Sequence, residues 1–236
     1  MNVLAVGCHP DDLEISCGGT LALYARRGHA VTMCHVANGD KGHVVVLPEE
    51  LKRIRHGEAE RSGRLLSAAE VVDLDVPDLL VDAKNEATVS LLVDVIRKCQ
   101  PDVIITHHPE DYMRDHVEVS RLVFNASFSA SVPHYYTGRA DAYGKIPPIY
   151  YMDTLAGMGF LPTEYVDITE TLDLKCQALE CHESQLKWLM DHDGVDFLDF
   201  VRTTAKYRGF QSAAKYAEGF QRCMVYPRMT TGRLLP

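Results

Sequence analysis

The chemically most suggestive stretch of this 236-residue chain is a histidine-proline-aspartate-aspartate sequence near its amino terminus, His9 to Asp12, with Glu14 two residues later. It follows an apolar run, residues 3–6, that we predict to be a buried strand. Charged side chains gathered in a poorly solvated cleft cost on the order of several kcal/mol each unless they are paired or coordinated. We therefore expect this group to bind a divalent metal ion.

A second group of histidines and acids follows another strand-like run, residues 102–106. It extends from His107 to His116 and includes Glu110, Asp111 and Asp115. In an open parallel sheet, ligands bind beyond the carboxyl ends of the strands, where the strand order reverses. If the two runs are the first and fourth strands, their ends lie side by side, so we predict one site split between the two loops.

The residue types suggest which side chains of this site are metal ligands and which are not. The proline fixes one backbone angle, so that His9 and Asp12 can face one metal while Asp11 points to its other side. With His116 as a third ligand, the site has two histidines, one aspartate and an open position, which is typical of a catalytic zinc with bound water. We expect one Zn²⁺ per chain, although such donors also accept Fe²⁺, Mn²⁺ or Co²⁺. The alternative is a capped loop whose polar groups only satisfy helix ends.

Three further features near these loops have weaker implications. The sequence Cys17-Gly18-Gly19-Thr20 lacks the dinucleotide-binding glycine pattern, and its glycines are better explained by close packing of the first helix. Residues 38–42, Asn-Gly-Asp-Lys-Gly, form a turn after the second strand, where Asp40 is a candidate to hold substrate hydroxyls. An ordinary solvated loop without a binding role explains residues 38–42 equally well. For His107 and His108 we expect mainly structural roles.

Composition narrows the choice of partners and compartment. The net charge of −9 argues against nucleic acid and anionic membranes, which require clustered lysine and arginine. Seven cysteines without a Cys-x-x-Cys pair fit a reducing cytoplasm. No apolar run approaches the roughly 18 residues of a membrane helix, and no export signal is evident. We expect a cytoplasmic protein that acts on a small molecule.

Apolar runs rich in β-branched residues alternate with helical patterns along the chain. This alternation predicts a Rossmann-like, doubly wound α/β fold, with a mainly parallel sheet covered by helices on both faces and one domain spanning residues 1–236. The expected strands are residues 2–8, 30–36, 71–74, 102–106 and 149–153. The expected helices are residues 18–27, 48–66, 86–99, 116–128, 169–189, 194–207 and 213–220.

Taken together, the motifs resemble those of the LmbE-like, PIG-L type metal-dependent de-N-acetylases along almost the whole chain. The residues that carry the resemblance are His9-Pro10-Asp11-Asp12-Leu13-Glu14 with Cys17-Gly18-Gly19-Thr20, Asn38-Gly39-Asp40-Lys41-Gly42, Arg55-His56-Gly57-Glu58, Asp115-His116, His182-Glu183-Ser184-Gln185 and Tyr216-Ala217-Glu218-Gly219-Phe220. The resemblance implies the LmbE-like fold and removal of an acetyl group from an N-acetylglucosamine-type sugar or conjugate.

The resemblance also implies roles for individual residues. His9, Asp12 and His116 would bind zinc, Asp11 would be the general base and then the general acid, and Arg55 would contact the sugar or its aglycone. Small members of the family assemble into homo-oligomers, so a hexamer or a smaller symmetric assembly is expected.

The chain departs from the family in the third motif, where His-x-Asp-His is usual and Met113 takes the first position. That histidine is thought to stabilise the oxyanion, and methionine has no hydrogen to donate. Losing one such donor typically costs about 100- to 1000-fold in rate. We predict that Tyr112 or His182 supplies the missing donor.

The alternative function is a metal-bound sugar-binding protein with little catalysis. Substrate specificity is expected from residues 41–48, 75–84 and 131–148.

Overall fold

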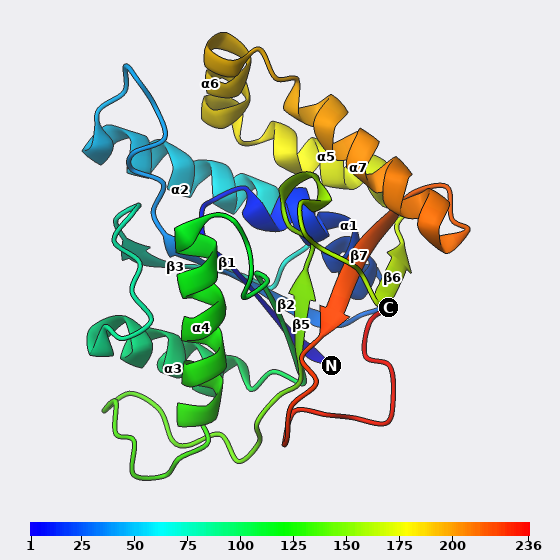
Figure 1. The fold of residues 1–236 in the computed structure, drawn as a ribbon. Helices are drawn as coiled ribbons and strands as arrows, with labels where there is room; N and C mark the ends of the chain where they lie inside the picture. Colours follow the sequence, from blue (N-terminus) through cyan, green and yellow to red (C-terminus); the bar gives the residue numbers. More distant parts are fainter.

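The computed structural model of the chain, which describes residues 1–236, is built around one seven-stranded sheet (Figure 1). Its strands are β1 (Asn2–Gly7), β2 (Ala30–Ala37), β3 (Glu70–Val76), β4 (Val103–Thr106), β5 (Ile149–Met152), β6 (Glu164–Asp167) and β7 (Ala217–Arg222). Its helices are α1 (Asp12–Arg26), α2 (Pro48–Leu65), α3 (Glu86–Cys99), α4 (Arg114–Ser129), α5 (Leu172–Glu180), α6 (Glu183–Asp193) and α7 (Phe197–Ser212), with a short 3₁₀ turn, η1 (Leu155–Gly157).

The strand order is β3-β2-β1-β4-β5-β7-β6, and all neighbours from β3 to β5 are parallel. Only β7 runs antiparallel, to both β5 and β6. Helices α3 and α4 cover one face, and the remaining α-helices lie on the other (Figure 1). The predicted mixed α/β fold with a mainly parallel sheet is therefore confirmed. No helix combines the length and the apolar character that a membrane crossing requires.

The first strand is buried on both faces, which explains why it is an uninterrupted apolar run. Val3 and Ala5 belong to the core beneath α1 and α5, whereas Leu4 and Val6 belong to the core beneath α3 and α4. Successive side chains of a strand point to opposite faces, so one short run serves both cores. This leaves polar residues only beyond the end of β1, where the histidine-aspartate sequence begins.

The carboxyl ends of β1 and β4 lie side by side, as predicted. The two strands are parallel neighbours with Val6 opposite Thr106, and the Thr106 hydroxyl donates to the Val6 carbonyl at 2.9 Å. The loops that follow both strands therefore emerge at one edge of the sheet. Residues 131–148, in contrast, precede β5 and lie at the opposite edge, away from these two loops (Figure 1).

Three element predictions differ from the structure. Helix α1 begins at Asp12 rather than at residue 18, so the second aspartate of the motif already belongs to the helix. The predicted helix 169–189 is two helices, which are separated at Cys181 and His182. The predicted helix 213–220 is wrong, because α7 extends to Ser212 and residues 217–222 form β7. Periodicity cannot distinguish a helix from a strand in so short a segment. Its pairing with β5 on one side and β6 on the other makes residues 217–222 a strand.

A buried ion pair joins α5 and the last strand to the first helix. The Glu218 carboxylate accepts from the backbone N–H groups of Gly19 and Thr20, at 2.9 and 2.8 Å, and from the Thr20 hydroxyl. The Lys175 ammonium donates to Glu218 and, at 2.8 Å, to the Ile15 carbonyl. Close packing of α1 accounts for Gly19 of Cys17-Gly18-Gly19-Thr20, since a Cβ there would lie 2.8 Å from the Ile168 side chain.

Lys175→Met is expected to lower the free energy of unfolding by about 3–5 kcal/mol, because it leaves the Glu218 carboxylate buried without a cation. Adding Glu218→Gln should recover part of this loss, because the second change removes the uncompensated charge. Urea unfolding of both variants measures the difference. Equal stability of the wild type and the single variant would contradict the prediction.

Candidate metal centre and catalytic site

The loops after β1 and β4 are joined by a direct contact between their first residues. The Cys8 backbone N–H donates to His107 Nε2 at 2.9 Å. His107 is buried, and burial, with help from nearby His116, lowers its pKa to about 4. Its ring is therefore neutral, and the lone pair of Nε2 is already engaged by the backbone.

Asp12 lies at the centre of a cluster of imidazoles. Its carboxylate oxygens lie 3.4 Å from a ring nitrogen of each of three histidines: His9, His107 and His116. It also accepts the His9 backbone N–H at 2.6 Å. Burial raises the pKa of Asp12, but His116 and His107 outweigh it and hold the pKa well below its usual range. Asp12 is thus an ionised carboxylate within the fold.

Asp111 orients His116 from the side away from Asp12. The Nδ1–H of His116 donates to Asp111 Oδ2 at 3.1 Å, and the second Asp111 oxygen accepts the Met113 backbone N–H. This leaves His116 Nε2 facing Asp12 without a hydrogen bond, on a side chain that is 2% exposed. A carboxylate behind a histidine in this way is the usual support of a metal-binding imidazole. No role was predicted for Asp111, although it lies between His108 and His116 in the sequence.

Asp111→Asn is expected to weaken metal binding by about 10- to 100-fold, the effect typical of residues that orient a ligand. The amide still accepts the His116 N–H but no longer supplies the negative charge behind the ring. Competition with a chelator measures the affinity. The matched control is Glu110→Gln, an exposed acid next in sequence. An affinity equal to that of the control would rule out the orienting role.

The donors in this cluster fit a metal ion. The 3.4 Å separations around Asp12 are close to the about 3.3 Å between neighbouring ligand atoms of a tetrahedral zinc with bonds of roughly 2.0–2.1 Å. The buried Nε2 of His116 has no other partner. Burial lowers the pKa of His116, yet Asp12 and Asp111 raise it to about 9, so the two carboxylates favour a cation at this position.

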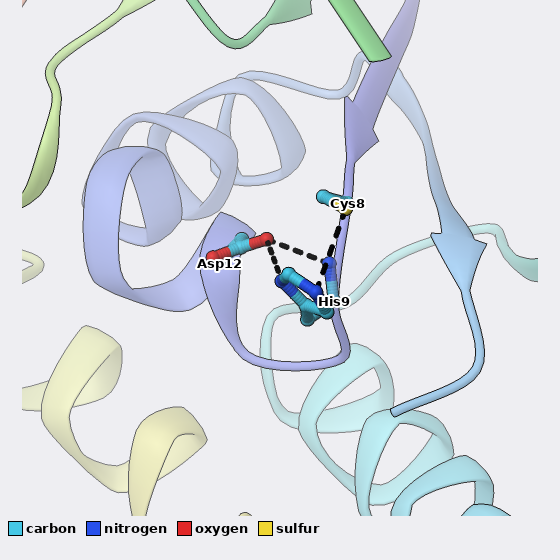
Figure 2. A group of neighbouring side chains, drawn as sticks. All are labelled: Cys8, His9 and Asp12. Carbon is cyan, nitrogen blue, oxygen red and sulfur yellow. Dashed lines mark hydrogen bonds and ion pairs between the residues drawn. The ribbon is translucent and has the colours of Figure 1, made fainter. Parts of the chain in front are cut away.

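Cys8 lies close to His9 on the other side of the cluster. Figure 2 shows His9 between Cys8 and Asp12, and the Cys8 sulfur is 3.7 Å from His9 Nε2. Two groups have all their potential ligand atoms within 4.8 Å of one another: Cys8, His9 and Asp12, and Asp12, His107 and His116. The predicted ligands His9, Asp12 and His116 are divided between these two groups, which share Asp12. Burial raises the pKa of Cys8 to about 12, so its thiol would have to lose a proton on binding a metal.

Asp11, the predicted general base, sits at the junction between the loop and α1 in a strained backbone conformation with φ of +128°. Arg55 Nη2 donates to its carboxylate at 3.2 Å and to the Pro10 carbonyl at 2.6 Å. Burial raises the pKa of Asp11 to about 6, despite the opposing effect of Arg55. A carboxyl with such a pKa can accept and return a proton near neutral pH.

Arg55, predicted to contact substrate, is 3% exposed and donates also to the Gly39 carbonyl. The guanidinium group of Arg55 is thus bonded to other groups of the protein.

Asp40 accepts the Asp78 backbone N–H at 3.0 Å, and both of its carboxylate oxygens contact the Lys41 ammonium. Asp78 in turn accepts from Gly39 and Lys41, and one of its oxygens is 4.0 Å from His9 Nε2. Asp78 is thus a neighbour of the site; it lies in the segment 75–84 that was expected to shape specificity, but the sequence did not single it out.

The two candidates for the oxyanion donor are placed very differently. His182 is fully buried, with Nε2 3.3 Å from Glu14 Oε1. Burial lowers its pKa, but Glu14 and Asp11 raise it above the ordinary value. Tyr112 is 63% exposed, in the loop that carries Asp111. His108 points elsewhere: its Nε2 faces Gln221 Oε1 at 3.2 Å.

Comparison with known proteins identifies a matching family and similar proteins. Residues 4–127 match the PIG-L family, which is described as GlcNAc-PI de-N-acetylase. The chain is 28% identical to the diacetylchitobiose deacetylase of Thermococcus kodakarensis, over 93% of this chain and 82% of the relative.

Two solved structures share the fold. The N,N'-diacetylchitobiose deacetylase of Pyrococcus horikoshii has a TM-score of 0.81 and 26% identity, covering 94% of this chain and 83% of its own. GalB, the 4-carboxy-2-hydroxymuconate hydratase of Pseudomonas putida, has a TM-score of 0.82 and 26% identity. The match covers 99% of this chain and 100% of GalB.

Proposed function

The chain belongs to the PIG-L family, and on this premise we propose that it is a zinc-dependent hydrolase that removes an N-acetyl group from a small N-acetylglucosamine-type substrate. The observation that carries the proposal is the placement of Asp11 immediately before Asp12, whose carboxylate faces the rings of His9 and His116 at 3.4 Å. These three residues would hold the metal. Iron, manganese or cobalt would fit the same donors.

When bound, the metal would supply a Lewis acid that polarises the acyl carbonyl and lowers the pKa of water. Asp11 would take a proton from the attacking water, whose oxygen forms a new bond to the acyl carbon. The C–N bond then breaks as Asp11 returns the proton to the leaving nitrogen. The products are acetate and a free amine. Arg55 would keep the Asp11 carboxylate in place through both transfers.

The developing oxyanion needs a donor besides the metal, and Met113 cannot provide one. Tyr112 and His182 stay our proposals for this role. Tyr112, being exposed, can reach a substrate without rearrangement of the core, whereas His182 would act from a buried position beside Glu14. Kinetics of Tyr112→Phe and His182→Ala would separate them, and full turnover in both variants would exclude both.

Amine release from a panel of N-acetylglucosamine conjugates by zinc-loaded protein tests the proposal. Release of amine and acetate in equal amounts supports it, and the conjugate with the highest kcat/KM defines the substrate class. Metal binding without release from any conjugate would count against it. The earlier alternative, a sugar-binding protein with little catalysis, is not favoured because the named relatives are enzymes.

A second candidate reaction is hydration of a carbon–carbon double bond in an unsaturated polycarboxylic acid. It rests on the similarity to the hydratase, which extends over the whole of that protein. The panel should therefore contain such an acid, with loss of its ultraviolet absorbance as the readout. We also propose a homo-oligomer in the cytoplasm, and light scattering of the purified protein would measure the assembly.

A further inference from the structure

The start of α6 contacts three separate elements of the site. Ser184 donates to Glu58 through its backbone N–H and its hydroxyl, at 2.9 and 2.7 Å. Gln185 Nε2 donates to the Gly42 carbonyl at 3.1 Å. His182, just before the helix, faces Glu14 of α1. His182, Ser184 and Gln185 thus link the start of α6 to α1, α2 and the loop after β2.

Helix α2 connects these contacts to the proposed base. Glu58 and Arg55 are three residues apart on α2, so they share its buried face, and both are almost fully buried. Glu58 accepts the two hydrogen bonds from Ser184 of α6. Arg55 donates to the Asp11 carboxylate and to the carbonyls of Pro10 and Gly39. The start of α6 is therefore connected to Asp11 through one face of a single helix.

The loop after β2 is anchored by three residues. Arg55 donates to the Gly39 carbonyl, and Asp78 accepts the N–H groups of Gly39 and Lys41. Gln185 holds Gly42, the last of these anchored positions. A Cβ on Gly42 would lie 3.3 Å from both Arg55 Nη1 and Gln185 Oε1, so the contact is tight.

Beyond Gly42 the chain leaves the body of the protein. Val44 and Val45 are among the most exposed apolar side chains, and the N–H groups of Val45 and Val46 turn inward only to His43 of the same loop. Gln185 therefore bonds the loop at the boundary between its anchored part, which contains Asp40, and its exposed part.

We propose that Gln185 is a positioning residue that fixes residues 39–42, and with them Asp40, relative to Asp11. The inference rests on the proposed function and on the expectation that Asp40 holds substrate hydroxyls. Gln185 touches no reacting atom and acts only through Gly42. Without its N–H₂ group the anchored part of the loop loosens, and substrate binding weakens while the proton transfer at Asp11 does not change.

The test compares Gln185→Ala and Gln185→Glu with the wild type. Glutamate keeps the volume of the side chain but presents no hydrogen to the Gly42 carbonyl. Both variants should raise KM about 5- to 10-fold, the factor expected for one neutral hydrogen bond, with kcat within about twofold. Gln177→Ala, an exposed glutamine on α5, is the matched control and should leave both constants unchanged.

Hydrogen exchange of the peptide covering residues 38–46 provides a readout that needs no turnover. Faster exchange there in both Gln185 variants, with residues 9–14 unchanged, supports the positioning role even if no substrate in the panel is hydrolysed. Unchanged exchange of 38–46 overturns it. Wild-type behaviour of Gln185→Glu alongside a defective Gln185→Ala would also overturn it, because volume rather than hydrogen bonding would then be responsible.

Discussion

Asp11→Asn is expected to lower kcat by about 100- to 10,000-fold, the range typical of a lost general acid–base catalyst. The amide has nearly the same shape as the carboxylate, so the strained turn before α1 and the contact with Arg55 can persist. What disappears is the ability to accept a proton from water and to return it to the leaving amine. Initial rates on the best substrate of the panel measure the effect, and KM should change little.

The control for this experiment is Asp173→Asn, since that side chain is 85% exposed on α5 and pairs only with Arg202. The zinc content of Asp11→Asn should equal that of the wild type, because Asp11 pairs with Arg55 and belongs to neither group of potential ligands. Normal turnover by a metal-loaded Asp11→Asn protein would show that another group is the base. Loss of both metal and activity would instead make Asp11 a ligand.

Substitution of the histidines is expected to separate ligands from supporting residues. His9→Ala and His116→Ala should each abolish tight metal binding, with losses exceeding the about 10- to 100-fold caused by removing a residue that only orients a ligand. His107→Ala should retain the metal with at most that smaller loss. The reason is the Cys8 N–H, which occupies the only His107 nitrogen that lies near Asp12.

Metal content after dialysis against a chelator decides between these outcomes. Retention by His9→Ala together with loss in His107→Ala would move the site to Asp12, His107 and His116, whose ligand atoms also lie within 4.8 Å of one another. His134→Ala is a suitable control, because His134 lies on an exposed loop at the opposite edge of the sheet. Far-ultraviolet circular dichroism would verify that each variant is folded.

The sequence alone predicted those parts of the site that follow directly from the order of strands and polar loops along the chain. Apolar runs ending in polar loops gave β1 and β4, and the rule for parallel sheets placed their ends together, which the pairing of Val6 with Thr106 confirms. Asp12 and His116 could be brought together by this reasoning. The distances that identify Asp12 as the shared neighbour of three imidazoles could not.

The contacts that the sequence did not predict are those made between distant segments. The Cys8 N–H bond to His107 depends on the register of two strands about one hundred residues apart. Asp78 approaches His9 because the chain turns at two left-handed residues, Asp75 near the end of β3 and Leu79 after it, which no turn signature predicted. The break before α6 depends on the burial of His182 against Glu14, and helical periodicity continues through it.

The ion pair between Lys175 and Glu218 has a consequence for the way the protein is made. Glu218 receives the N–H groups of Gly19 and Thr20, 199 and 198 positions earlier in the chain. At about 5–20 residues per second, a ribosome needs about 10–40 s to synthesise this interval. During that time the helix that begins with Asp12 lacks the carboxylate that completes it. The first helix to be synthesised therefore completes its contacts only after Glu218 has emerged.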